Sequence, residues 1–383
     1  MIPLHTVAEH RSARGEIHLS ESAVIRAYHD HLVIAPLSLA NLCETSGVKI
    51  FGEDGHRTVL PFLVYLDLNK WVEIAKWRTE GSQSGRPEGF DTALRWATSG
   101  TVLFPLSSGH FFEIAKIGDD KRRRTLANTM ADLSQGWFLV SPGNLIKREL
   151  RRAMARTFHK TFSDIPPVPI TRNISWVFAR PDQVDLARED RLFQQPGFLR
   201  EYLATARINR PFLESWDRIA QEHEWSRGIV RTGSRTLRKR AYCARLTMAI
   251  REVFESALVE TGLTSTDMGK LGPDGAVQLL ESVSFLDVEM FLHVERNEHR
   301  DRRIQANDEI DIGFLRMAVP YCDHVITEKF WSSLLLRNGF DEKYVTTIGS
   351  DLTGVLARVA SKVGMSMSVF DEVGKVGTSR AKL

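Results

Sequence analysis

The fold is decided by the stretch Phe62-Leu63-Val64-Tyr65-Leu66-Asp67-Leu68-Asn69-Lys70-Trp71. Its first five residues are apolar, and a run of this length and composition is typical of a buried strand. A carboxylate follows directly, and open α/β sheets bind their ligands outside the carboxyl ends of the strands. Burying a charge is costly unless the charge is paired or bound to a metal. The sequence therefore predicts that Asp67 meets a partner at that edge of the sheet.

Composition sets the first limits on the class of protein. The chain has 383 residues, which is enough for about two domains or for one domain with a large insertion. Lys and Arg number 51 against 48 Asp and Glu, so the net charge of +3 does not by itself indicate a nucleic-acid partner. The three cysteines are far apart and form no CxxC motif, which excludes zinc ribbons and thioredoxin-like redox sites.

No targeting or membrane segment is evident in the sequence. The first residues lack the basic segment and apolar run of a signal peptide. No apolar run approaches the ~20 residues that cross a bilayer. A cytoplasmic location is therefore the expectation, with the terminal Ala381-Lys382-Leu383 as a weak peroxisomal alternative.

The periodic patterns divide the chain into five parts. We predict an N-terminal extension over 1–58, a first core part over 59–159, a mostly helical insertion over 160–299, a second core part over 300–361 and a tail over 362–383. The predicted core strands are Phe62–Asp67, Thr101–Leu106, Trp137–Val140, His324–Thr327 and Tyr344–Thr347. The predicted helical stretches of the insertion are Phe198–Glu222, Thr236–Glu260 and Ala276–Val294. A strand–helix alternation that stops and resumes indicates one α/β sheet with an insertion.

Acidic residues recur where the predicted core elements end. They are Asp67 after the first strand, Glu113 in an apolar helical turn, Asp308 and Asp311 on one helix face, and Asp323 and Glu328 on either side of the strand His324–Thr327. Several carboxylates at one sheet edge cannot all stay ionised without a cation. Because oxygen ligands favour hard cations, this pattern predicts a Mg²⁺ or Mn²⁺ site.

With these acids in place, the chain resembles the PIN-domain nucleases. The likeness rests on the strand ending in Asp67, the sequence Ser-Ser-Gly-His-Phe-Phe-Glu113-Ile-Ala, the sequence Asn307-Asp308-Glu309-Ile310-Asp311, and the stretch from Leu315 to Lys329. It covers residues 59–150 and 300–350 and says nothing of 160–290. The resemblance implies a PIN-like three-layer α/β/α fold with a central parallel sheet.

The resemblance also implies roles for the acids. Asp67, Glu113 and Asp311 look like the family's first three acids, with Asp308 as the rival for the third place. Glu328 looks like the fourth, where the family more often has Asp or Asn, and Asp323 is a less certain metal contact.

The implied activity is Mg²⁺- or Mn²⁺-dependent hydrolysis of RNA phosphodiester bonds. In such a site, the metal activates a water and stabilises the charge on the reacting oxygens. The likeness is compatible with a toxin or phage-defence effector, a homodimer, and a cognate inhibitor or defence-system partner. DNA is the alternative substrate, and a catalytically idle scaffold that binds nucleic acid or protein is the alternative function.

Ordinary structural roles stay open for the same residues. Asp67 would otherwise cap the helix that follows it, and Glu113 would be a solvated residue on a helix face. Asp308, Asp311 and Glu328 would be acids at helix N-termini, which the helix macrodipole favours.

Local charge and aromatic residues supply the remaining evidence for an RNA partner. Three basic runs, Lys121–Arg124, Lys147–Arg156 and Arg235–Arg240, suit phosphate contacts but are equally typical of solvated faces. Trp225 lies in a polar stretch and is the only tryptophan that the pattern favours for base stacking.

Overall fold

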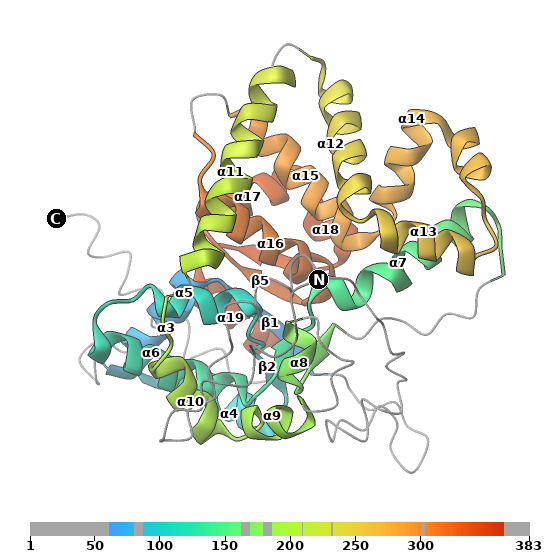
Figure 1. The fold of residues 1–383 in the computed structure, drawn as a ribbon. Coiled ribbons are helices and arrows are strands. Elements are labelled where there is room, and N and C mark those ends of the chain that lie inside the picture. The colour runs from blue at the N-terminus through green and yellow to red at the C-terminus, as the bar shows by residue number, and fades with distance from the viewer. Residues whose placement is uncertain are drawn as a thin grey trace, which may run out of the picture.

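The structure is a computed structural model that describes residues 61–79, 87–161, 169–178, 186–208, 210–230, 233–299 and 303–363. The described residues are mostly helical and contain a small parallel sheet of four strands (Figure 1). The predicted extension over 1–58 lies outside the described residues, as does all but the start of the predicted tail. In the described part of the chain, no helix has both the length and the apolar composition needed to cross a bilayer.

The sheet joins strands from the two ends of the described chain. Its strands are β1 (Phe62–Leu66), β2 (Val102–Leu103), β5 (His324–Ile326) and β6 (Thr347–Gly349). They are all parallel and lie in the order β2-β1-β5-β6. Leu66 is in register with Ile326. The predicted adjacency of the strand ending at Asp67 and the strand ending at Thr327 is therefore confirmed.

The helices fall into a core set and an insertion set. The core helices are α3 (Leu68–Thr79), α4 (Pro87–Ser99), α5 (Ser108–Ala115), α6 (Asp120–Ser134), α7 (Pro142–Thr157), α16 (Ala306–Tyr321), α17 (Lys329–Arg337), α18 (Phe340–Tyr344) and α19 (Leu352–Val363). The insertion helices are α8 (Ile174–Val177), α9 (Leu186–Phe193), α10 (Pro196–Ala204), α11 (Arg210–Val230), α12 (Arg235–Ala249), α13 (Arg251–Glu260), α14 (Ser265–Glu281) and α15 (Ser284–Glu298).

The sheet winds in two directions from its centre. Helices α3 and α4 lead from β1 to β2 on one side, whereas α17 and α18 lead from β5 to β6 on the other. The strand order therefore reverses between β1 and β5. In open α/β sheets, the crevice at the carboxyl ends of two such strands is the usual ligand site.

Alternation along β1 gives each face of the sheet its own core, because successive strand residues point to opposite faces. Val64 and Leu66 pack with side chains of α3, α4, α6 and α19. Leu63 and Tyr65 pack with side chains of α15, α16 and α17. Helices thus cover both faces of the sheet. Because both faces are buried, the residues of β1 are apolar at every position rather than at alternate positions.

The insertion has a further core of its own, shared with α7. Side chains of α12, α13, α14 and α15 pack there with Leu145, Leu150 and Met154. The region is not purely helical, because β4 (Ile170–Thr171) pairs antiparallel with β3 (Phe138–Leu139). Figure 1 shows the insertion helices α11 to α15 gathered on one side of the sheet, and α8 to α10 on the other side with α4 and α6.

Three predicted helices of the insertion are each divided in the structure. The stretch Thr236–Glu260 breaks at Ile250, whose backbone (φ −108°, ψ 17°) leaves the helical region. The other two stretches contain the ends of α10 and α14. The helices on either side of each break both bury an apolar face, so the apolar periodicity continues across the break. Periodicity alone therefore cannot show where one helix ends and the next begins.

Two predicted core strands differ from the structure. The segment Tyr344–Thr347 lies mostly in or after α18, and the strand begins only at Thr347. Trp137–Val140 contributes β3, which pairs with β4 and makes a single parallel bridge from Phe138 to Leu106 rather than joining the four-stranded sheet. Short strands of this kind are defined by their partners, which the local sequence does not specify.

Candidate functional site

Asp67 lies at the carboxyl end of β1, at the point where the strand order reverses. Its N–H donates to Ile326 O over 2.9 Å and so extends the pairing with β5. Its Oδ1 accepts from the Leu68 N–H at 2.7 Å, and its Oδ2 accepts from Thr327 Oγ1 at 3.4 Å. The residue is only 9% exposed. Burial raises the pKa of Asp67 to about 6, and the negative charge of Glu328 adds to this rise.

The Asp67 carboxylate accepts only the N–H of the first residue of α3, Leu68, and neither it nor the Glu328 carboxylate bonds to the second or third N–H of the following helix, as an ordinary N-cap does. The N–H groups of Lys70 and Trp71 in α3 bond to the backbone carbonyl of Asp67, not to its side chain. Glu328 is the N-cap residue of α17, but its side chain makes no capping hydrogen bond. Its Oε1 instead accepts from Asn69 Nδ2 at 2.6 Å. This contact joins the segment after β5 to the segment after β1.

Glu113 reaches the same edge of the sheet from α5. A buried histidine, His110, ties this helix to β1, since its Nε2 lies 2.9 Å from Leu66 O. The backbone N–H of Ser107 donates to the Nδ1 of His110 at 2.8 Å, so Nε2–H is the donor to the strand. Burial lowers the pKa of His110 to about 4 and keeps the ring neutral. One turn further along α5, Glu113 has its pKa raised to about 8 by burial and by the charge of Asp67.

Asp311 approaches from α16. Its Oδ2 accepts from Trp331 Nε1 of α17 at 2.9 Å. Burial raises the pKa of Asp311 well above its ordinary range, and the negative charges of Asp67 and Glu113 raise it further. Four predicted acids thus act electrostatically on one another, although α5 and α16 lie almost 200 residues apart in the sequence.

A glycine permits this convergence of α5 and α16. A Cβ atom added at Gly109 would lie 1.8 Å from the Cζ atom of Phe314, and real Cβ atoms never approach a neighbour so closely. The Phe314 ring of α16 therefore packs directly on the backbone of α5. Glu113 lies four residues after Gly109, and Asp311 lies three residues before Phe314, so the contact sets the spacing of the two acids. Sequence reasoning missed this glycine, because its neighbour comes from a remote segment.

The four acids, which we call the acidic site, suit a hard divalent cation. They grade from the buried Asp67 through the half-buried Glu113 and Asp311 to the exposed Glu328, so the site opens toward solvent. All its ligand atoms are oxygens, as Mg²⁺ and Mn²⁺ prefer. Burial raises the pKa of Asp67, Glu113 and Asp311, the charges of neighbouring acids raise it further, and a bound cation would favour the ionised carboxylates. The donor set therefore fits such an ion.

Two other predicted metal ligands lie apart from the acidic site. Asp323 precedes β5 and lies at the opposite, amino edge of the sheet, where its Oδ2 accepts from the Leu63 N–H at 2.7 Å. Asp308 completes a capping box at the start of α16 by accepting from the Gln305 N–H at 3.0 Å. Both carboxylates thus have structural partners, and of the two acids on α16 it is Asp311 whose pKa the charges of Asp67 and Glu113 raise.

Removing the half-buried charge at Glu113 should stabilise the metal-free protein at alkaline pH. The pKa of Glu113 is higher in the folded protein than in the unfolded chain. The folded state therefore becomes less stable as pH rises between the two pKa values, here from about 4.5 to about 8. Glu113→Gln should therefore match the parent near pH 5 and exceed it by roughly 1–2 kcal/mol at pH 8, discounted for partial exposure, or about 2–8 °C in Tm. Thermal melts in EDTA at both pH values measure this difference. Parallel pH dependence of the two proteins would contradict it.

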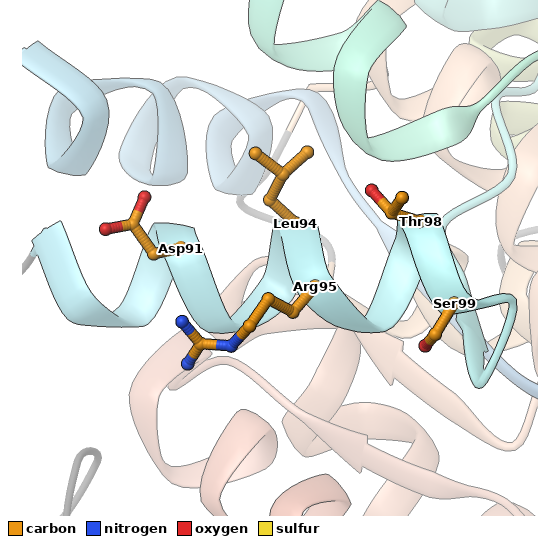
Figure 2. Close-up of a pocket in the computed structure, with 5 residues that line it drawn as sticks. All are labelled: Asp91, Leu94, Arg95, Thr98 and Ser99. Atoms are coloured by element: carbon orange, nitrogen blue, oxygen red, sulfur yellow. The ribbon is translucent and has the colours of Figure 1, made fainter.

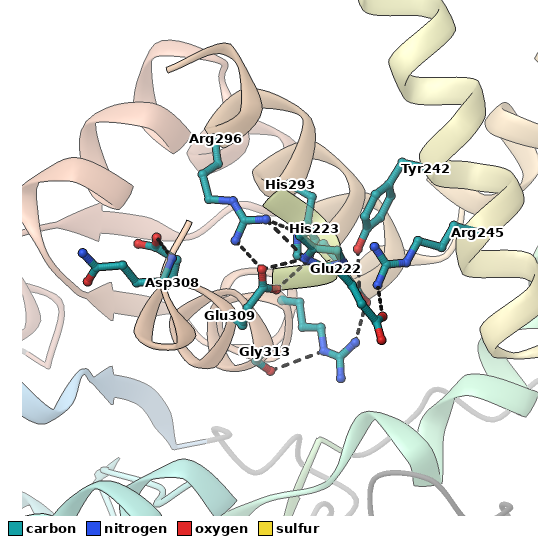
Figure 3. Close-up of polar contacts among 12 residues, drawn as sticks. Glu222, His223, Tyr242, Arg245, His293, Arg296, Asp308, Glu309 and Gly313 are labelled. Atoms are coloured by element: carbon teal, nitrogen blue, oxygen red, sulfur yellow. Dashed lines mark hydrogen bonds and ion pairs between the residues drawn. The ribbon is translucent and has the colours of Figure 1, made fainter. Parts of the chain in front are cut away.

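A second polar cluster, which the sequence did not reveal, lies between α11, α15 and α16 (Figure 3). Glu309 Oε1 lies 2.6 Å from His223 Nδ1 and accepts from Arg296 Nη1 at 2.7 Å. Arg296 Nη2 lies 3.0 Å from His293 Nδ1. Although burial opposes ionisation of Glu309, the hydrogen bond from His223 and the charge of Arg296 lower its pKa below the ordinary value.

This cluster is tighter than the acidic site but is already neutralised. Among the described residues, His223, His293 and Glu309 form the only group of three metal-ligating side chains whose ligand atoms all lie within 4.8 Å of one another. Arg296, only 1% exposed, supplies the positive charge that a metal would bring. Its guanidinium also bonds to atoms that a metal would need, so we assign the cluster a structural role.

The predicted basic runs are largely paired with acids. The pairs are Arg123–Asp120, Arg124–Glu201, Lys147–Glu260, Arg151–Glu260, Arg152–Glu149, Arg235–Glu295, Arg238–Glu298, Lys239–Glu281 and Arg240–Asp274. Several of these pairs join neighbouring helices of the insertion. Their charges are therefore less available to phosphate than the sequence alone indicated. The charges of Lys70 and Lys116, which belong to none of these runs, act on Asp67 and Glu113.

The surface has two hollows that none of the four acids lines. One, of about 510 Å³, is lined by Asp91, Leu94, Arg95, Thr98 and Ser99, which all belong to α4 (Figure 2). Its polar groups do not converge, since Arg95 bonds to Thr92 of its own helix. The other, of about 490 Å³, lies between α11 and the start of α16.

Comparison with protein families, curated proteins and solved structures finds no match for this chain. Function must therefore be argued from the residues of the acidic site themselves.

Proposed function

We propose that this protein is a PIN-like, Mg²⁺- or Mn²⁺-dependent ribonuclease. The proposal is supported by the positions of Asp67 and Glu328 after β1 and β5, and by the charges of Asp67, Glu113 and Glu328, which raise the pKa of Asp311. A cluster of mutually repelling carboxylates at a topological switch point is a poor stabiliser of a fold but a suitable metal site. Perturbed ionisable groups of this kind concentrate at functional sites.

Each acid has a distinct part in the proposed site. Asp67, Glu113 and Asp311 would hold the metal, and Glu328 at the open side would complete its ligands. When bound, such an ion lowers the pKa of water and stabilises charge on phosphoryl oxygens. Lys116 lies at the rim, with its Nζ 3.2 Å from Asn307 Oδ1, and presents a cation for a substrate phosphate.

The proposal is tested by incubating the protein with labelled RNA and Mn²⁺. Asp67→Asn keeps the size and hydrogen bonds of the side chain but removes the most central charge. It should lower the cleavage rate by roughly 100-fold or more, since even residues that only orient metal ligands account for 10–100-fold effects. Asp91→Asn, on the exposed surface of α4, is the matched control and should cleave like the parent.

Three results would overturn or redirect the proposal. Cleavage that survives EDTA, or that survives Asp67→Asn, would exclude the metal mechanism. Cleavage of DNA in preference to RNA would mean that the same metal-dependent chemistry acts on DNA. Absence of any cleavage, together with a Tm that Mn²⁺ leaves unchanged at pH 8, would favour an idle scaffold.

A further inference from the structure

A groove lies between α11 and the start of α16, the helix that also carries Asp311. Side chains of α11, among them Gln221, Glu224 and Trp225, form one wall of the groove, and the segment from Arg303 to Ala306 forms the other. The walls are held together, because the Ile304 N–H donates to Glu224 Oε2 at 3.0 Å. The groove is therefore a fixed feature of the junction between the insertion and the core.

Trp225 is the residue that sets this groove apart. Its side chain is 71% exposed, whereas large apolar side chains elsewhere in the chain are mostly buried. Its indole makes no hydrogen bond or ring contact to any described residue. An exposed ring of this kind does not stabilise the fold. A free aromatic face is, however, a surface on which a nucleobase stacks.

The polar groups of the groove favour a base over a phosphate. Asp217 and Glu224 would repel an anion from its interior. They accept hydrogen bonds, and the Gln221 amide can both donate and accept, as the edges of a base require. The exposed Arg303 lies at the margin, where it can meet the backbone of the same strand.

The groove and the acidic site share the first turns of α16. Ala306 lines the groove, Asn307 contacts Lys116, and Asp311 belongs to the acidic site. Asp311 lies five positions after Ala306, which is about 7.5 Å along a helix axis and about 140° around it. A single strand with one base in the groove therefore has to run around α16 before a phosphate of the same strand meets the acids.

We propose that the Trp225 groove binds one unpaired nucleobase of the strand that the acidic site cleaves. This inference rests on the proposed nuclease function and specifies its substrate as single-stranded nucleic acid. A paired base is not free to enter a groove between two protein walls, so a duplex should bind weakly. The insertion thereby becomes part of the substrate site, since Trp225 belongs to α11.

Binding without cleavage tests the groove separately from catalysis. Fluorescence anisotropy would follow a fluorescein-labelled single-stranded RNA titrated with Asp67→Asn protein in EDTA. In this background, Trp225→Ala should weaken binding by about tenfold, equivalent to about 1.4 kcal/mol and within the range of one stacked base. Trp225→Phe should retain most of the affinity, because it keeps an aromatic face. Met248→Ala on α12, which removes another exposed apolar side chain (66% exposed), is the matched control.

The outcomes separate the groove from the nuclease. Unchanged affinity in Trp225→Ala, with a melting temperature equal to that of the control, overturns the groove proposal. Equal loss in Trp225→Ala and Trp225→Phe, or equal binding of a duplex RNA, also overturns it. Loss of affinity in Trp225→Ala alone supports it, whether or not Asp67→Asn abolishes cleavage. Persistent cleavage by Asp67→Asn would instead refute the proposed metal mechanism and leave the binding result standing.

Discussion

Arg296→Ala should lower the free energy of unfolding by about 3–5 kcal/mol, the usual effect of breaking a buried ion pair from one side. The guanidinium is 1% exposed, and its partner Glu309 is 3% exposed. Without Arg296, the buried carboxylate keeps only its contacts to His223 and His293. Denaturant unfolding at neutral pH measures the loss, and α11 should be the first helix to lose protection from hydrogen exchange.

The matched comparison is the double variant Arg296→Met, Glu309→Gln. It removes both charges and keeps apolar volume, so it should be markedly more stable than Arg296→Ala, as replacement of whole buried pairs is often tolerated. A double variant as unstable as Arg296→Ala would show that packing by the Arg296 side chain, and not charge pairing, holds α11 to α16. Zinc-dependent stability in the parent protein would contradict the structural role of the cluster.

Gly109→Ala should destabilise the protein by roughly 1–3 kcal/mol and also weaken Mn²⁺ binding at the acidic site. The added methyl group would overlap the Phe314 ring, which is only 6% exposed and has little room to move. The helices α5 and α16 would have to separate, and Glu113 would move away from Asp311. Thermal melts with and without Mn²⁺ at pH 8 measure both effects.

A double-mutant cycle identifies the cause. Phe314→Ala alone should leave a cavity and cost about 3–5 kcal/mol. Combined with Gly109→Ala, it should cost less than the sum of the two, because the new methyl group enters the space of the missing ring. Strict additivity would mean that Gly109 acts on its own helix rather than through the contact with Phe314.

The sequence predicted those parts of the fold that depend on consecutive residues. The apolar run before Asp67 formed β1. The acids after β1 and β5 could also be placed, because parallel strands present their carboxyl ends at one edge. The PIN likeness, the metal and the RNA substrate remain proposals, although the observed sheet of four parallel strands agrees with the α/β class.

Position along the chain did not show which acids would converge. Asp311 and Asp308 lie one turn apart on α16, yet the charges of Asp67 and Glu113 raise the pKa of Asp311, while Asp308 caps the helix. Asp323 looked like a neighbour of Glu328, but β5 carries the two to opposite edges of the sheet. Hydrogen-bond partners distinguish a structural carboxylate from a ligand, and the partner of Asp308 is the nearby Gln305, whereas that of Asp323 is the distant Leu63.

Sequence by itself therefore determined the strand that ends in Asp67 and the chemistry of an acid at its end. Tertiary structure alone decided which carboxylates meet it, that Arg296 already neutralises the His223–Glu309 cluster, and that Trp225 stands free beside α16. The physical reason is the separation along the chain of the residues that interact. Strand and helix patterns reflect burial and periodicity within a few residues, whereas pKa shifts, close helix contacts and free aromatic faces depend on groups brought together from far along the chain.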